Sequence, residues 1–189
     1  MLVNDQYVRT LLMNELKTCY INDLNTRIIN ELGIDFGASR VDVAVVNGII
    51  HGYEIKSDMD NLNRLPRQIS YYNRLFQRMT IVSSRKYYEQ IYEMVPQWWG
   101  IKVLSADNKR LIEKRKGRVQ NNQDKELLLR LLWKKDLEGF VDFLNLPKKL
   151  KLFKKNQLLE IFTQEADIKL IREYTYQALK NRPNWRKEL

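Results

Sequence analysis

The chain has 189 residues, a formal net charge of +10 at pH 7, one cysteine and one histidine. Its length allows one to two domains, and no apolar run approaches the ~18 residues that cross a bilayer, which argues against a membrane protein. The lone Cys19 excludes an internal disulfide and a cysteine-rich zinc site. The first residues lack a charged segment followed by an apolar stretch, so we expect no secretion signal and a cytoplasmic location.

Apolar periodicity predicts the elements of the first 106 residues. Spacings of three and four over 6–32 predict one helix, which Gly33 ends. Two runs rich in β-branched residues flank Asn47-Gly48 and predict an antiparallel hairpin. The strands of this hairpin cover 40–46 and 49–56, and they are followed by a helix over 61–77, a strand over 79–84, a helix over 85–95 and a strand over 100–106. Pro66 is expected near the first turn of its helix or at a kink.

From Asp107 the pattern changes to charged helices joined by polar breaks. We expect a linker over 107–124 and a basic helical domain over 125–189, with residues 1–106 as a separate domain. The helices are predicted near 125–134, 137–144, 157–164 and 168–181, with Asp124, Asp136, Asn156 and Asp167 as N-caps. The fold class that follows is α/β, and more narrowly α+β, with a basic C-terminal helical lobe.

The positive charge is concentrated in the second part of the chain. Residues 1–107 contain 12 Lys and Arg against 12 Asp and Glu, and residues 108–189 contain 21 against 11. Because Lys and Arg release counterions from phosphates, this predicts nucleic acid as the partner, with DNA favoured over RNA. The residues expected to bind it are Lys148, Lys149, Lys151, Lys154 and Lys155. The alternatives are a solvated helix face, or a surface that docks a protein partner or a second copy of the chain.

Three residues of the predicted hairpin carry candidate chemistry. Glu54 and Lys56 alternate on one strand and therefore project from the same face. Asp42, on the other strand, lies among apolar residues, where a carboxylate is costly unless it is paired or binds a metal. Two carboxylates suit Mg²⁺, whose other ligands are usually water and substrate, and Glu31 could add a further one. The alternative is that these are ordinary surface acids, with Lys56 paired to one of them.

An Asp, a gap across a hairpin and Glu-x-Lys on the next strand resemble the signature of the PD-(D/E)xK nuclease superfamily. The element order resembles the common core of that superfamily. The stretch RVDVAVVNGIIHGYEIKSDMDNLNRLPRQISYY, followed by VPQWWGI, is also similar to an uncharacterised bacterial family assigned to it. The resemblance covers residues 25–106 and implies a restriction-endonuclease-like core with a mixed central sheet flanked by helices. One departure is that Val41, and no proline, precedes Asp42.

The resemblance also implies roles for individual residues. Asp42, Glu54 and the Ile55 carbonyl would bind Mg²⁺ or Mn²⁺, and Lys56 would position the attacking water or stabilise transition-state charge. Glu31, expected at the end of the first helix, resembles an acid that orients water or holds a second metal. Gln68 resembles an accessory residue that places the lysine or the substrate, and Tyr72 lies one helical turn further along.

Five other residues have both a functional and a structural interpretation. Arg40 and Arg67 would contact phosphates or be surface charge. His51 is interpreted as a surface residue of its strand rather than as a base. Trp98 and Trp99 are expected to close the end of the core, with base stacking as the alternative.

Two functions from different classes follow from these residues. The first is an Mg²⁺-dependent nuclease of the repair or defence type that hydrolyses phosphodiester bonds. The second is a nuclease-fold subunit that binds nucleic acid or assembles a complex, with little or no catalysis. Divalent-dependent cutting would favour the first, and a salt-sensitive but uncut complex would favour the second.

The hairpin register decides whether the two carboxylates can share a metal. A two-residue loop at Asn47-Gly48 would leave Asp42 opposite Tyr53, on the wrong face. The chemistry requires Asp42 opposite Glu54, which needs either a three-residue loop with Gly48 in the left-handed region or a bulge marked by Gly52. We predict one of these irregularities, with the carboxylates within about 6 Å of each other.

Overall fold

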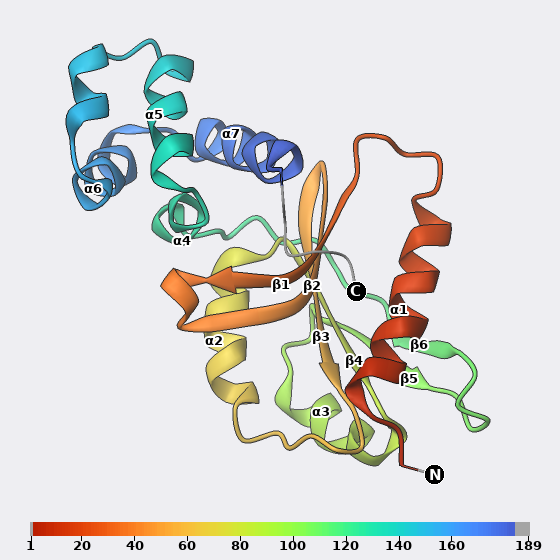
Figure 1. Ribbon diagram of the computed structural model, residues 1–189. Coiled ribbons are helices and arrows are strands. Elements are labelled where there is room, and N and C mark those ends of the chain that lie inside the picture. The colour runs from red at the N-terminus through yellow and green to blue at the C-terminus, as the bar shows by residue number, and fades with distance from the viewer. Residues whose placement is uncertain (1, 184–189) are drawn as a thin grey trace.

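The computed structural model describes residues 2–183, which form a six-stranded mixed sheet with helices on both faces (Figure 1). The strands lie side by side in chain order: β1 Arg27–Ile34, β2 Ser39–Asn47, β3 Ile49–Lys56, β4 Arg78–Ser83, β5 Gly100–Leu104 and β6 Leu111–Arg115. β3, β4 and β5 are parallel, and the other neighbours are antiparallel. This arrangement confirms the predicted α+β class.

The helices are α1 Asp5–Cys19, α2 Leu65–Leu75, α3 Tyr88–Met94, α4 Lys125–Arg130, α5 Lys134–Phe143, α6 Lys155–Glu165 and α7 Ile168–Asn181. Three 3₁₀ turns are η1 Asp35–Gly37, η2 Arg85–Tyr87 and η3 Lys148–Leu152. Pro66 lies in the first turn of α2, as predicted. Among residues 2–183, none of the helices combines the length and the apolar character needed to cross a bilayer.

Alternating side chains of β2 supply two cores, one on each face of the sheet. Val43 and Val45 pack with α1, whereas Ala44 and Val46 pack on the face that α2 and α3 cover. The central strands β3, β4 and β5 are therefore buried on both faces, as parallel strands usually are. This burial fixes the backbone that presents the candidate site.

The first helix is shorter than predicted. α1 ends at Cys19, and residues 27–34 form β1 rather than the second half of a helix. The turn between them is held by Asp23, whose carboxylate accepts from the Asn25 N–H at 2.9 Å and from the Thr26 hydroxyl at 3.0 Å. The β-branched pair Ile28-Ile29 then favours a strand. Glu31 consequently lies on a strand and not at the end of a helix.

The segment expected as a linker is tied to the sheet. Part of it forms β6, which pairs with β5 and was not predicted. Further on, the backbone N–H groups of Arg118, Gln120 and Asp124 each donate at 2.8 Å to carbonyl groups of the first 106 residues. These hydrogen bonds hold the segment 107–124 against the first 106 residues, near the end of α2 and the starts of β4 and β5.

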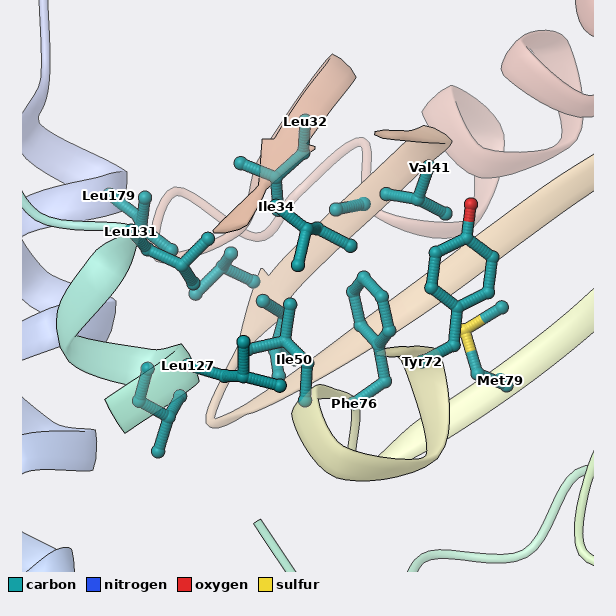
Figure 2. Close-up of a cluster of buried hydrophobic side chains, with 14 of the residues drawn as sticks. Leu32, Ile34, Val41, Ile50, Tyr72, Phe76, Met79, Leu127, Leu131 and Leu179 are labelled. Atoms are coloured by element: carbon teal, nitrogen blue, oxygen red, sulfur yellow. The ribbon is translucent and has the colours of Figure 1, made fainter. Parts of the chain in front are cut away.

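The C-terminal helices α4 to α7 gather at one end of the sheet (Figure 1). Leu127, Leu131 and Leu179 lie close to Ile34 and Ile50 of the sheet, and all five belong to one buried cluster (Figure 2). The predicted helical lobe therefore shares a continuous core with the sheet.

Two of the four predicted N-caps are confirmed. Asp124 accepts from the Leu127 N–H at 3.1 Å, and Asp167 accepts from the Lys169 N–H at 2.7 Å. The other two predictions are wrong, because α5 and α6 begin earlier and their N-caps are Trp133 and Lys154. Asp136 and Asn156 lie inside these helices. Asp136 still caps α5 from within, since its carboxylate accepts the Trp133 N–H at 2.8 Å.

Candidate functional site

The hairpin register runs in the direction that the shared metal site requires, with paired residue numbers that sum to 96. β2 and β3 pair with Asn47 opposite Ile49 and continue in step to Val43 opposite Tyr53, where the paired residues end. Asp42 and Glu54 are the residues that follow this last pair on the two strands. Gly48 at the turn has a φ of +65°, in the left-handed region. The predicted three-residue loop is confirmed, and the alternative bulge at Gly52 is not present. The predicted spacing of the two carboxylates stays a prediction.

Beside the site, the side chains of β1 and β2 depart from the regular alternation between the two faces of the sheet. Val41 packs on the α2 face and Val43 on the α1 face, although residues two apart on a regular strand share a face. Glu31 lies opposite Asp42 in the β1–β2 register and has a φ of +57°. That conformation costs a non-glycine residue about 1–2 kcal/mol. The irregularity turns Asp42 toward β3, where its Oδ2 accepts the Ile55 N–H at 2.7 Å.

Glu54 is the centre of a buried hydrogen-bond network. The residue is only 2% exposed. Oε1 accepts from Lys56 Nζ at 2.6 Å and from Gln68 Nε2 at 2.6 Å, and Lys56 Nζ also donates to Gln68 Oε1 at 3.1 Å. The structure therefore brings together three of the residues that sequence analysis selected, on β3 and α2.

Tyr72 holds the second oxygen of Glu54. Its hydroxyl lies 2.8 Å from Glu54 Oε2 and 2.7 Å from the Arg40 carbonyl oxygen. Burial, and then the charge of Glu54, raise the pKa of Tyr72, so the phenol keeps the proton that it donates. The ring stacks on Trp99, whose Nε1 donates to Asn73 Oδ1 at 2.9 Å. Trp99 is fully buried, which confirms its predicted place in the core, whereas Trp98 is partly exposed.

Arg9 of α1 is a residue at this site that the sequence analysis missed. Its guanidinium donates to Asp42 Oδ1 at 2.8 Å, to the Asp42 carbonyl at 2.9 Å and to Glu31 Oε1 at 3.2 Å. Glu31 Oε2 also pairs with Arg40 Nε at 2.9 Å. Glu31 is thus joined to Asp42 through Arg9. Nothing in the sequence marks Arg9 apart from its one-turn spacing from Asp5, with which it forms an ion pair at 3.2 Å.

The negative charges of Asp42 and Glu54 repel each other. Burial raises the pKa of Asp42 to about 7, and the charge of Glu54 acts in the same direction, against the Ile55 N–H and Arg9. A divalent cation relieves this kind of repulsion, and Mg²⁺ is commonly held by one or two carboxylates with water as the other ligands. Asp42 and Glu54 supply ligands of the chemical type that such an ion binds. Residues 2–183 contain no group of three His, Cys, Asp or Glu side chains placed to bind a metal, so a site here would rest on these two.

A cleft of about 630 Å³ opens beside the network. Gln68 and Glu31 line it near the candidate metal site, together with Arg40, Arg64 and Arg67. Trp133, at the start of α5, lines it from the helical lobe. Arg40 and Arg67 therefore lie where phosphates would pass if a strand reached the carboxylates, and their contact with phosphates stays a prediction.

The five lysines predicted to bind nucleic acid do not share one helix face. They fall in η3 and at the start of α6: Lys148, Lys149, Lys151, Lys154 and Lys155. Lys151 Nζ donates to Asp142 Oδ2 at 2.6 Å, and Lys155 Nζ lies 4.9 Å from the ring centre of Phe36. The other three are exposed. Residues 148–152 form the 3₁₀ turn η3 rather than an α-helix, and the choice between solvated charge and nucleic-acid binding stays a prediction.

His51 is buried, so its predicted surface position is wrong. Its Nε2 lies 2.9 Å from Thr80 Oγ1, and its Nδ1 lies 3.1 Å from the Tyr53 hydroxyl. Burial lowers the pKa of His51 to about 3, and Arg78 adds to this effect, so the ring is neutral near pH 7. His51 stacks on Tyr53, which belongs to the core under α1, whereas Glu54 bonds to Gln68 and Tyr72 of α2 on the other face.

Comparison with known proteins gives one family, one sequence relative and one solved structure of limited similarity. A sequence profile described as "Bacteriophage P4 protein cII" matches residues 2–188. Protein cII of Enterobacteria phage P4 is 29% identical over 155 residues, which are 81% of this chain and 58% of the phage protein. A solved protein of unknown function from Silicibacter pomeroyi aligns with a TM-score of 0.45 and 18% identity, over 64% of this chain and 75% of that chain.

Proposed function

We propose that the chain, which belongs to the bacteriophage P4 protein cII family, is a metal-dependent nuclease that hydrolyses phosphodiester bonds in nucleic acid. The observation that carries this proposal is that Asp42 and Glu54 follow directly on the last hairpin pair, Val43 and Tyr53, while Glu54 bonds to Lys56 and Gln68. Because the match spans 58% of the phage protein, the proposal concerns this chain's own residues. The resemblance to PD-(D/E)xK nucleases supports it, since these residue types act together there.

Each residue of the network has a proposed task. Asp42, Glu54 and the Ile55 carbonyl would hold Mg²⁺ or Mn²⁺, which would activate water and offset the negative charge of the phosphate. The Lys56 ammonium is held beside Glu54 as a fixed positive charge, where it would stabilise charge that develops on the phosphate. Gln68 uses both ends of its amide and therefore fixes Lys56 and Glu54 relative to each other.

One observation favours a second candidate, a protein of this fold that binds nucleic acid with little or no catalysis. Both oxygens of Glu54 are engaged by side-chain donors, and the residue is 2% exposed. A metal would have to share Glu54 with Tyr72 on Oε2 or displace a donor from Oε1. A carboxylate oxygen has two lone pairs, so sharing at Oε2 is chemically open.

A cleavage assay tests the proposal. The full chain is incubated with single-stranded, duplex and branched DNA and RNA in Mg²⁺, in Mn²⁺ and in EDTA. We expect divalent-dependent cutting that Asp42→Ala and Glu54→Ala abolish, because each removes a metal ligand. Glu93→Gln, an exposed acid on α3, is the matched control and should cut as the unaltered chain does. Circular dichroism checks that the variants fold.

The second candidate makes a different prediction in the same assay. It is supported if the nucleic acid stays uncut in both metals while a salt-sensitive complex forms. Cutting that persists in both alanine variants would reject the nuclease assignment for this site.

A further inference from the structure

We propose, on the basis of the nuclease function above, that the cleft beside Gln68 takes a single strand of nucleic acid. Its phosphates would lie at Arg40, Arg64 and Arg67, and one unpaired base would lie on the ring of Trp133. All four residues line the same cleft of about 630 Å³. The substrate class is therefore single-stranded DNA or RNA, or the unpaired part of a longer substrate.

The charge of the cleft suits a phosphate backbone. Three arginines line it against one acid, Glu31, so its lining carries a net positive charge. Arg64 and Arg67 are exposed, and within residues 2–183 no ion pair engages either of them. Arg64 is the N-cap of α2 and precedes Arg67 by three residues and Gln68 by four, so its position on the helix surface neighbours both of them. A phosphate held by these arginines would lie next to the side chain that contacts Glu54 and Lys56.

Trp133 is exposed but held in place. Its residue exposure is 52%, yet the guanidinium of Arg182 lies 4.1 Å from the ring centre and covers one face. Arg182 is itself buried and donates to the Leu131 carbonyl at 3.1 Å and to Asp136 Oδ2 at 2.5 Å. The ring is therefore fixed from behind. An aromatic ring with few freely rotating bonds and an open face binds a base with little loss of conformational entropy.

The stacking geometry selects a single strand. In a duplex the faces of the bases are stacked on one another, so a tryptophan ring reaches only a base that is unpaired or at a strand end. The cleft volume also falls in the range of about 300–1,000 Å³ that is typical of pockets for small ligands. A space of this size holds a short segment of one strand. DNA and RNA share both the phosphates and the base faces that this cleft would recognise.

Fluorescence anisotropy with labelled oligothymidine, oligouridine and a blunt DNA duplex tests the inference. The full chain is used in EDTA, which prevents divalent-dependent cutting. We expect both single strands to bind more tightly than the duplex at equal salt, and Trp133→Ala to weaken that binding about 5- to 100-fold. Trp133→Phe should retain most of the affinity. Tyr92→Ala, a matched aromatic that is 51% exposed on α3, should bind as the unaltered chain does.

Three outcomes would overturn the inference: equal affinity for duplex and single strands, unchanged binding in Trp133→Ala, or an equal loss in Tyr92→Ala. The relative affinities of the two single strands identify DNA or RNA as the source. The nuclease proposal is judged separately by cutting. If the chain cuts nucleic acid but Trp133 has no role in binding, only the proposal of single-strand binding in the cleft is rejected. If binding depends on Trp133 but no cutting occurs, only the nuclease proposal is rejected.

Discussion

Lys56 contributes charge and not coordination to the proposed site. Its ammonium donates to Glu54 and Gln68, and a charged lysine has no lone pair for a metal. Lys56→Met replaces the lysine with a side chain of similar length that is apolar and carries no charge. We expect turnover to fall about 10²- to 10³-fold, as when one stabilising donor is lost, with a much smaller change in the metal concentration that supports half-maximal cutting. Steady-state cleavage across a Mg²⁺ titration measures both, and undiminished turnover would remove Lys56 from the mechanism.

His51 should make the stability of the chain depend on acid pH. Its pKa is about 3 in the folded chain against an ordinary value of 6.5, so the unfolded chain takes up the proton first as pH falls. The stabilising contribution is complete above pH 6.5 and is lost toward pH 3, at up to about 1.4 kcal/mol per pH unit. His51→Gln should therefore lose less unfolding free energy over this range. Urea unfolding at pH 7, 5 and 4 tests this, and a wild-type-to-variant difference that stays constant with pH would contradict it.

At the scale of single elements, Gly52 on β3 shows how closely α2 packs on the sheet. A Cβ at this position would collide with the Met79 sulfur and lie 3.0 Å from the Phe76 ring. Gly52→Ala should therefore destabilise the fold by about 1–3 kcal/mol through overpacking. Gly33→Ala on β1 is the control, because nothing lies within 4 Å of the added atom. Urea unfolding compares the two, and equal losses would show that close packing is not why position 52 is a glycine.

The hairpin and α2 could be predicted from sequence because their signals are local. Asn47-Gly48 fixes the turn, and Pro66 marks the first turn of the helix. β1 could not be predicted, since the apolar residues of 27–34 also fit helical spacing and only pairing with β2 settles the matter. The short, polar edge strand β6 carries no alternation strong enough to predict it. Glu31 and Arg9 reach Asp42 through these tertiary contacts, so sequence alone did not reveal how they meet.

At the scale of the whole molecule, the continuous core predicts that the sheet and the C-terminal helices unfold together. Leu131, at the end of α4, is 5% exposed and packs in the cluster that also contains Ile34 and Ile50. Leu131→Ala should reduce the unfolding free energy by about 2–5 kcal/mol. Hydrogen exchange should show the same loss for sheet amides and helix amides. A loss confined to the helices would instead support the predicted division into separate domains at 107–124.

The central claim is that Asp42 and Glu54 together bind one divalent cation. Isothermal titration of the full chain with Mn²⁺ tests this directly, without any substrate. We predict one binding site in the unaltered chain, lost in Asp42→Asn and in Glu54→Gln, because each substitution replaces a charged oxygen ligand with an amide. Glu93→Gln should bind as the unaltered chain does. The claim would be contradicted if the unaltered chain did not bind Mn²⁺. It would also be contradicted if both variants bound Mn²⁺ as tightly as the unaltered chain does.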